Sequence, residues 1–424
     1  MSTRLRQWIA SRDFIALILI AGILTAFALT VSVRDFLSYW TAGQQLIHRA
    51  NPYDADAVAR LESAAGFHGP LRSLIMLNPP TALPLALPLG LVSSRTGGLL
   101  WSLCLFGCLV ASVRMVWTLH GSPPNYIHII GYCFGPAIAC VLAGQIPLFA
   151  LLGLGLFLRL HRTHPFSAGA SLWLCAVKPH LFLPFGVVLI VWILTTRRYR
   201  IAIGAAAALA ASTAFIWLLD PSAWTQYRQM MHALAPAIAR EFLPAWSVVL
   251  RRSISPHPVW LQGLPAAVGC IWALWYFFQH RREWNWLEHG SLLMIVSLLV
   301  APYAWLIDQS VLIPALLHGA YRARSRTVTA ILASASTLIL IQIFLESGVR
   351  SRWNLWPAPF WLLWYLWATS ARRTGISASG AEFASSSAAL PLVGDSEAAP
   401  CPKQPKSPLT ALSANRTLAD RFIS

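Results

Sequence analysis

The chain has 424 residues, of which 57% are hydrophobic and only 11% are charged. This composition leaves too little polar surface for a water-soluble globular protein. The formal net charge of +17 would suggest nucleic-acid binding in a soluble protein, but no basic stripe interleaved with aromatic residues occurs outside the apolar runs. The composition therefore indicates an integral membrane protein.

Apolar runs that approach the roughly 20 residues needed for a helical membrane span recur along most of the chain. We expect an all-α polytopic bundle of about 10–13 transmembrane segments. The predicted spans lie near residues 14–33, 74–92, 98–119, 126–143, 146–160, 179–196, 201–219, 259–279, 290–306, 309–321, 327–345 and 353–370. The first run follows the basic segment MSTRLRQWIASRD without a small-residue cleavage site, so we interpret it as an uncleaved first span.

Arginine clusters border these runs and predict the cytoplasmic face, because basic residues concentrate in cytoplasmic loops. The clusters are Arg4/Arg6/Arg12, Arg159/Arg162, Arg197/Arg198/Arg200, Arg281/Arg282, Arg322/Arg324/Arg326 and Arg372/Arg373. This orientation places two large loops, residues 34–73 and 220–258, on the extracytoplasmic side. We expect the protein in the inner (plasma) membrane, with its active face outside the cytoplasm.

Between residues 74 and 143 the number of predicted spans is off by one: it does not bring the following arginine clusters to the cytoplasmic side. One segment there is therefore predicted to be re-entrant. The first candidate is the run 74–92, which contains four prolines, since broken backbone at membrane depth needs cover from protein or water. The stretch 166–195 is predicted to form a hairpin that turns near Lys178. Residues 1–373 are expected to form the membrane domain, and residues 374–424, rich in Ser, Ala and Pro, a disordered cytoplasmic tail.

The first loop opens with DFLSYWTAGQQLIHRAN, residues 35–51, in which apolar residues recur at helical spacing. We expect interfacial helices in this loop, the first of them amphipathic and lying at the membrane surface. Asp35 stands at the start of this predicted helix. It is either an N-terminal cap or a general base that accepts a proton from a sugar hydroxyl at the interface.

Lys178 and Asp308 are the next candidates, because both lie within apolar surroundings. Lys178 is the only lysine before residue 403 and is followed by Pro179 and His180. It is either a snorkelling interface lysine or a contact for a departing phosphate. Asp308 is expected to pair with an arginine or tyrosine, or to line a sugar pocket, because an intramembrane carboxylate needs a partner or a cavity.

The remaining polar candidates each have a structural alternative. Gln145 either hydrogen-bonds a sugar hydroxyl or caps a helix end. Asp54 follows the turn signal Asn-Pro-Tyr, so it either caps a turn or touches substrate. Arg251 and Arg252 are either interface anchors or further phosphate contacts. The seven cysteines contain no CxxC pair, and neither a metal site nor a disulfide framework is predicted.

Five short motifs resemble glycosyltransferase family 87 in their order and spacing. They are Arg34-Asp35-Phe36-x-x-Tyr39-Trp40-x-Ala42-Gly43 followed by Asn51-Pro52-Tyr53-Asp54, then Asn78-Pro79-Pro80, Gly144-Gln145-Ile146, Ala176-Val177-Lys178-Pro179, and Ala301-Pro302-Tyr303-Ala304-Trp305 with Asp308. Each motif alone is weak, but five in order are fairly specific. The resemblance covers roughly residues 30–320.

The resemblance implies a GT-C-type membrane enzyme that transfers a hexose, typically mannose, from a polyprenyl-phosphate donor to a glycan or lipid acceptor. Inversion at the anomeric carbon is implied, with Asp35 as the base and no cofactor or metal. The expected donor- or substrate-binding residues are Tyr39, Asp54, Gln145, Lys178, His180, Arg251, Arg252 and Asp308. The rival interpretations are a transporter or flippase for a lipid-linked sugar, and a non-catalytic scaffold; no internal repeat is apparent, which counts mildly against a transporter built from inverted repeats.

Overall fold

The computed structural model describes residues 17, 18, 22, 35–67, 74–255, 258–345 and 352–370, and within them the fold is entirely helical. Most of the predicted first span and the whole of the predicted tail lie outside the described residues. The all-α fold that composition indicated is therefore confirmed.

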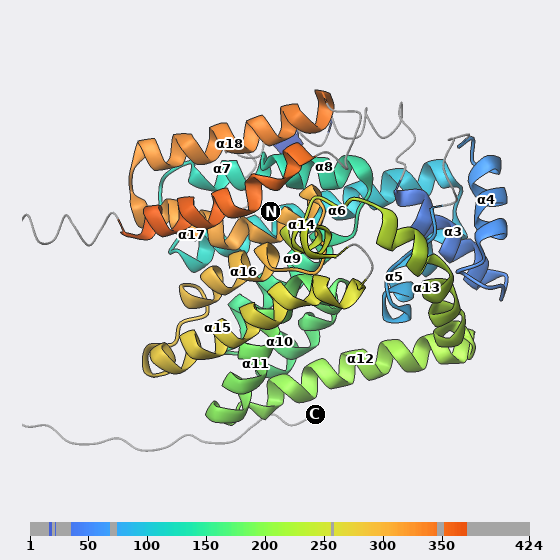
Figure 1. The fold of residues 1–424 in the computed structure, drawn as a ribbon, viewed down its shortest axis with the longest axis horizontal. Coiled ribbons are helices and arrows are strands. Elements are labelled where there is room, and N and C mark those ends of the chain that lie inside the picture. The colour runs from blue at the N-terminus through green and yellow to red at the C-terminus, as the bar shows by residue number, and fades with distance from the viewer. Residues whose placement is uncertain are drawn as a thin grey trace, which may run out of the picture. The chain divides into compact units, whose positions relative to one another are not determined.

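The helices follow one another closely along the chain (Figure 1). The α-helices are α3 Phe36–Ile47, α4 Ala55–Ala64, α5 Leu83–Ala86, α6 Ser94–Leu119, α7 Ile127–Tyr132, α8 Gly135–Ala143, α9 Pro147–Leu160, α10 Pro165–Ser171, α11 Leu183–Thr196, α12 Tyr199–Leu219, α13 Ala223–Arg240, α14 Trp246–Ile254, α15 Leu264–His280, α16 His289–Leu299, α17 Ile313–Ala323 and α18 Arg326–Leu345. The 3₁₀ helices are η1 Pro80–Ala82, η2 Leu87–Leu91, η3 Leu172–Val177, η4 Pro179–Phe182, η5 Val259–Gly263, η6 Arg281–Glu283, η7 Leu306–Leu312 and η8 Arg352–Leu355. Residues 357–370 form a further helix.

Five helical stretches in the described residues are long and apolar enough to cross a membrane: Ser94–Leu119, Pro179–Thr196, Tyr199–Leu219, Val259–Glu283 and Arg326–Ile343. The other apolar runs form shorter helices, mostly because prolines and glycines interrupt them. The predicted span 126–143, for example, is divided into α7 and α8, and α8 begins at Gly135-Pro136. The protein is thus a multi-spanning membrane protein, and the total of 10–13 segments stays a prediction.

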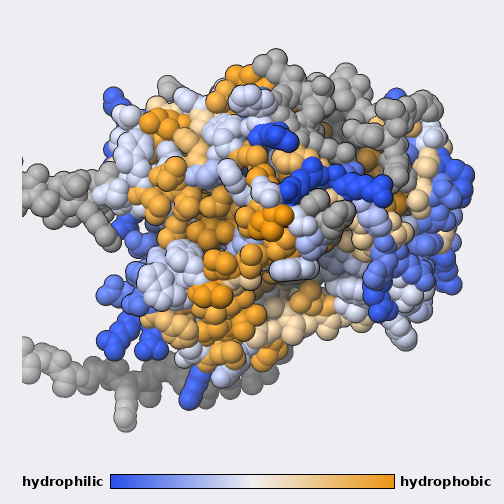
Figure 2. Space-filling view, in the orientation of Figure 1, coloured by the Kyte–Doolittle hydropathy of each residue, from blue (hydrophilic) through white to orange (hydrophobic). Residues whose placement is uncertain are grey.

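Polar segments gather at two opposite ends of the helices. Helices α3, α4 and α13, from the two large loops, lie together with α5 at the right of Figure 1. The turn from α17 to α18 and the arginine-bearing end of α15 lie at the left. Figure 2 shows mainly apolar residues between these ends and hydrophilic residues at both. The two loops therefore share one end, as predicted, and the arginine clusters of α15 and α17 occupy the other.

Helix α3 forms as its periodicity predicts, but it does not lie on the surface of the protein. Ten of its twelve residues are buried, including the polar Ser38, Thr41 and Gln45. Its backbone packs directly on α5 and η2, because Gly43 and Gly90 lack the side chains that would hold the two segments apart. The face that the sequence assigns to the membrane surface is thus covered by protein.

The proline-rich run 74–92 is broken, as predicted, into η1, α5 and η2. Side chains from neighbouring elements satisfy its carbonyl groups. Trp173 Nε1 and Ser212 Oγ donate to Thr81 O at 3.0 and 2.8 Å, and Gln44 Nε2 donates to Gly90 O at 2.8 Å. Protein cover of this kind is what irregular backbone requires at membrane depth.

The predicted hairpin that turns near Lys178 is confirmed. The chain changes direction where η3 ends and η4 begins, at Lys178 with φ −137° and ψ 67°. The two ends of the hairpin meet again, because Arg198 Nη1 donates to His161 O at 3.1 Å. Lys178 therefore lies at the turn, remote from the arginines at the other end of the hairpin.

Candidate functional site

Asp35, Gln145 and Tyr39 form one hydrogen-bonded group, although they are far apart in the sequence. Gln145 Nε2 donates to Asp35 Oδ2 at 2.8 Å, and Tyr39 Oη donates to Gln145 Oε1 at 3.2 Å. Asp35 holds the N-terminal position of α3, but its side chain accepts no capping hydrogen bond from that helix. The carboxylate is therefore directed to Gln145, and the capping alternative fails.

The turn between α8 and α9 places Gln145 in this group. Gly144 ends α8 in the left-handed region at φ 73°, which glycine adopts without the steric cost of a Cβ. Trp101 Nε1 donates to Gly144 O at 2.7 Å, and Asp35 N donates to Ala143 O at 3.2 Å. The Gly-Gln pair thus has a physical role: glycine makes the turn and glutamine reaches the carboxylate.

Tyr39 is a hydrogen-bond donor in this group. Its side chain is 3% exposed. Burial, with the nearby Asp35 carboxylate as the second cause, raises the pKa of Tyr39 well above its ordinary value. The phenol therefore stays protonated and orients the Gln145 amide so that its NH₂ group faces Asp35.

Lys178 and Asp308 form a buried ion pair that joins the hairpin turn to η7. Lys178 Nζ lies 2.7 Å from Asp308 Oδ1, and the two side chains are 9% and 0% exposed. The second carboxylate oxygen accepts from Trp305 N at 2.8 Å and so caps η7. Lys178 does not snorkel to the surface, and the partner of Asp308 is a lysine where we expected an arginine or tyrosine. The sequence could not reveal this partner, because the two residues lie on separate apolar segments.

Cys140 lies beside the Asp35 group, because its Sγ donates to Gln145 O at 3.2 Å. Helix α8, which carries Cys140 and ends just before Gln145, packs against η7, which carries Asp308. The Asp35 group and the Lys178–Asp308 pair therefore lie on neighbouring elements, α3, α8, η3 and η7, and form one candidate site.

His180 and the second loop form the next wall of the site. The His180 ring stacks on Tyr303, with ring centroids 3.9 Å apart, and its Nε2 is buried without a hydrogen-bond partner among the described residues. Ser247 Oγ of α14 donates to Ala301 O and Pro302 O at 2.7 and 2.6 Å. The second loop is thereby held against the segment that leads to Asp308.

Three of the sequence candidates have structural contacts of their own. Asp54 caps α4, accepting from Asp56 N and Ala57 N at 2.9 and 3.2 Å. Arg251 Nη2 donates to Ala239 O at 2.9 Å, and Arg252 Nη2 donates to Arg240 O at 2.6 Å. The substrate roles of these three residues stay predictions.

Comparison with known proteins decides the family. The model of glycosyltransferase family 87 matches residues 76–302, more than half of the chain. The chain belongs to glycosyltransferase family 87. No curated protein and no solved structure matches it.

The family 87 match contains some of the site residues and leaves others outside. Gln145, Lys178 and His180 lie within residues 76–302, whereas Asp35 and Asp308 lie outside it. The hydrogen bond from Gln145 and the ion pair from Lys178 connect the matched region to these two carboxylates. The chain is therefore a membrane glycosyltransferase by family, and the hydrogen bond and ion pair join Asp35 and Asp308 to the candidate site.

The sequence of this family 87 chain did not predict Cys140, Tyr303 and Trp305 as individual parts of the candidate site. Cys140 was interpreted as one of several small core residues in an apolar run. Tyr303 and Trp305 were present in a motif but carried no individual role. Only the fold shows that these three residues contact or flank the charged groups.

Proposed function

We propose that this membrane glycosyltransferase transfers a hexose, with mannose as the first choice, from a polyprenyl-phosphate donor to an extracytoplasmic glycan or lipid acceptor. One observation carries the proposal. A carboxylate, Asp35, is oriented by neutral hydrogen-bonding groups within the same site as a buried ammonium, Lys178. A base and a cation close together are what transfer from a phosphate leaving group needs.

The reaction follows from these two groups. The Asp35 carboxylate takes the proton of the acceptor hydroxyl while the acceptor oxygen attacks the anomeric carbon. The bond from that carbon to the phosphate oxygen breaks, and the polyprenyl phosphate leaves with the bonding electron pair. Attack on the face opposite the leaving group inverts the anomeric configuration. Lys178 offsets the charge that develops on the departing phosphate.

The other site residues have supporting roles in this proposal. Gln145 and Tyr39 hold the Asp35 carboxylate in position. Asp308 holds Lys178 in position through the ion pair. His180 offers a buried ring nitrogen to a sugar hydroxyl while Tyr303 supports the ring. Family membership favours this enzyme over a transporter or flippase.

The test is sugar transfer in membranes from radiolabelled polyprenyl-phosphate mannose. Asp35→Asn removes the base without changing its size, and a general base contributes on the order of 10²–10⁴-fold to rate. We expect transfer to fall by about that factor. Asp220→Asn is the matched control, since Asp220 lies in the turn at the start of the second loop, where its Oδ1 accepts from Ser222 N at 2.9 Å and from Ser222 Oγ.

Two outcomes contradict the proposal. Turnover by Asp35→Asn at the rate of the unaltered protein would exclude Asp35 as the base. Movement of the lipid-linked sugar across proteoliposomes without covalent transfer would instead favour a flippase. A donor series with mannose, glucose and galactose on the same carrier identifies the sugar, and we expect mannose to be transferred fastest.

A further inference from the structure

A cavity lies away from Asp35, where α6 ends and α17 leads into α18. Its volume is about 870 Å³. It is lined by His120, His318, Tyr321, Arg322, Arg324 and Arg326, together with uncharged residues of α7, α18 and the loops beside them. Three of these are arginines, and none of the lining residues in the described chain is acidic.

The length of helix α6 gives the distance between this cavity and the end of the helices where Asp35 lies. Its first turn lies beside α3, because Gly97 contacts the Phe36 ring, and His120 follows its last residue in the cavity wall. A helix of 26 residues is about 39 Å long at 1.5 Å per residue. That length is close to the roughly 40–45 Å of a bilayer with its headgroups. The cavity therefore lies at the headgroup level of the opposite leaflet.

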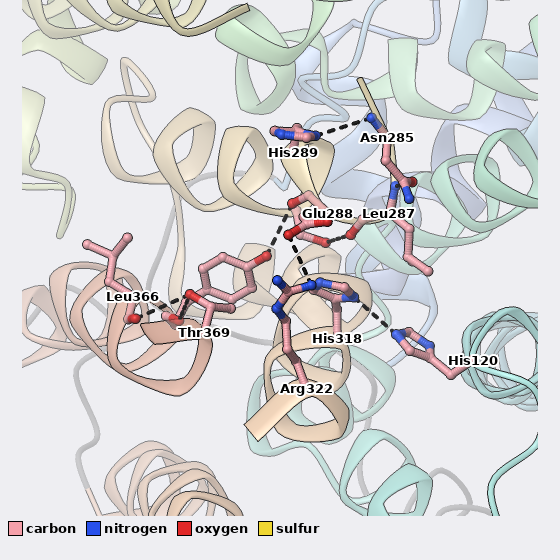
Figure 3. A network of polar contacts seen from close by, with 11 residues as sticks. His120, Asn285, Leu287, Glu288, His289, His318, Arg322, Leu366 and Thr369 are labelled. Carbon is pink, nitrogen blue, oxygen red and sulfur yellow. Dashed lines mark hydrogen bonds and ion pairs between the residues drawn. The ribbon is translucent and has the colours of Figure 1, made fainter. Parts of the chain in front are cut away.

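The polar wall is short of hydrogen-bond partners. His318 is 7% exposed, and neither its Nε2 nor Tyr321 Oη, both buried, has a hydrogen-bond partner among the described residues. Figure 3 shows the His318 ring between His120 and Arg322, with His120 Nε2 and His318 Nδ1 3.1 Å apart. His120 Nδ1 donates to Val116 O at 2.8 Å, so the neutral pair is ordered as His318 Nδ1–H to His120 Nε2. This leaves His318 Nε2 as a hydrogen-bond acceptor, suited to a hydroxyl group of a ligand and not to a phosphate oxygen.

The arginines are only partly neutralised. Arg322 Nη1 lies 3.0 Å from Glu288 Oε1, an ion pair that Figure 3 shows beside His318. Arg324 and Arg326 are exposed and make no ion pair with a described residue. Guanidinium groups in such a cluster match the geometry of phosphate oxygens.

The apolar part of the lining belongs to segments next to the membrane. Ile127 begins α7, while Ala330 and Ala333 lie on α18, a helix with only 28% of its apolar window buried in the protein. A soluble anion would gain nothing from this wall, whereas an acyl or prenyl chain would bury apolar surface there. The cavity thus joins a phosphate-binding end to a lipid-facing side.

We propose that this cavity binds the phosphate of an anionic membrane lipid, with the lipid chains against α7 and α18. The predicted orientation puts it on the cytoplasmic side, where anionic lipids attract basic side chains. The site is separate from the one assigned to sugar transfer. Its ligand holds the α6, α17 and α18 ends together.

Binding of dioctanoyl phosphatidylglycerol to the purified full chain in detergent tests the proposal, with dioctanoyl phosphatidylcholine and inorganic phosphate as separate arms. We expect saturable binding of phosphatidylglycerol at one site per chain, and weaker binding of the other two. The double variant Arg324→Gln/Arg326→Gln should weaken binding about tenfold or more, since hydrogen bonds to charged groups are the strong ones. The matched control is Arg281→Gln/Arg282→Gln, an exposed basic pair at the same end.

A further variant separates the two halves of the cavity. Ala333→Phe fills the apolar wall, so it should weaken phosphatidylglycerol binding and leave phosphate binding unchanged. Equal affinity of the unaltered protein and Arg324→Gln/Arg326→Gln for phosphatidylglycerol would overturn the site. If inorganic phosphate binds as tightly as the lipid and Ala333→Phe has no effect, the ligand is a soluble anion, and the proposal of a lipid is wrong.

Discussion

Charged side chains are as deeply buried as Lys178 and Asp308 only when they are paired. The pair has two explanations that differ in their consequences. As a purely structural contact it would be replaceable by apolar residues of similar volume. As a phosphate site it would need the lysine itself. Because removal of one partner leaves a buried charge, single variants cannot separate these explanations, and a paired replacement is needed.

The single variant Lys178→Met should lower the free energy of unfolding by about 3–5 kcal/mol, since it leaves Asp308 buried and unpaired. The double variant Lys178→Met/Asp308→Leu should recover most of that loss. Thermal unfolding in detergent measures stability, and sugar transfer measures activity. We expect the double variant to be stable and inactive. Full activity of the double variant would assign the pair to structure alone.

At the scale of single residues, sequence predicted most members of the site but not their partners. Lys178 and Asp308 stood out because each is a rare charge in an apolar run, and Asp35 because it opens a helix. Sequence offered no sign that a glutamine 110 residues away would orient Asp35. Residues that become hydrogen-bond partners only through tertiary packing cannot be recognised from the spacing of nearby residues in the sequence.

Close packing of α3 on the broken segment from α5 to η2 sets the position of Asp35. A Cβ added at Gly43 would meet the carbonyl oxygen of Ala86, and one added at Gly90 would meet the backbone of Gly43. Backbone atoms cannot rotate away as the end of a side chain can. The helix that begins at Asp35 therefore depends on glycine at both positions.

Gly43→Ala should separate α3 from this segment and destabilise the protein by about 1–3 kcal/mol, the usual cost of overpacking. Sugar transfer should fall as well, because α3 carries Asp35 and Tyr39. Gly107→Ala is the matched control: Gly107 lies within α6, and a Cβ there meets nothing within 4 Å. Thermal unfolding and transfer measured on both variants check the prediction. An unaltered melting temperature for Gly43→Ala would show that the two segments are not held as described.

At the level of elements, hydropathy predicted helices reliably and their ends less well. The helical character of α3, α6, α11 and α12 follows directly from apolar periodicity or run length. The burial of α3 on nearly all sides does not, because Ser38, Thr41 and Gln45 are polar residues that find protein rather than water. The proline-rich run covers part of these residues, and its irregular backbone cannot be predicted from hydrophobic periodicity.

On the scale of the whole molecule, the arrangement of the two loops is the feature on which the mechanism depends. Tyr53 of the first loop and Tyr227 of the second have ring centroids 5.5 Å apart. Both loops must therefore face the same side of the membrane. The arginine-bearing end of α15 lies at the other end of the helices (Figure 1).

Cysteine labelling tests this topology in a background without the native cysteines. Single cysteines at Asp56, Gln229 and Arg282 are suitable, because all three residues are exposed. We expect a membrane-impermeant maleimide to label the first two from outside the cell and the third only after permeabilisation. Labelling of Asp56→Cys and Arg282→Cys from the same side would contradict the orientation and the proposed extracytoplasmic reaction.

Helix α9 is unusually short for its place in the bundle, and its length fixes how deep the reaction takes place. Its 14 residues extend about 21 Å, against a hydrocarbon core of about 30 Å. With Arg159 placed at the headgroup level, a helix of this length along the membrane normal puts Gln145 and the carboxylate it holds about 9 Å beneath the opposite edge of the hydrocarbon core. On the proposed mechanism, an acceptor would therefore have to reach below the headgroups to meet Asp35.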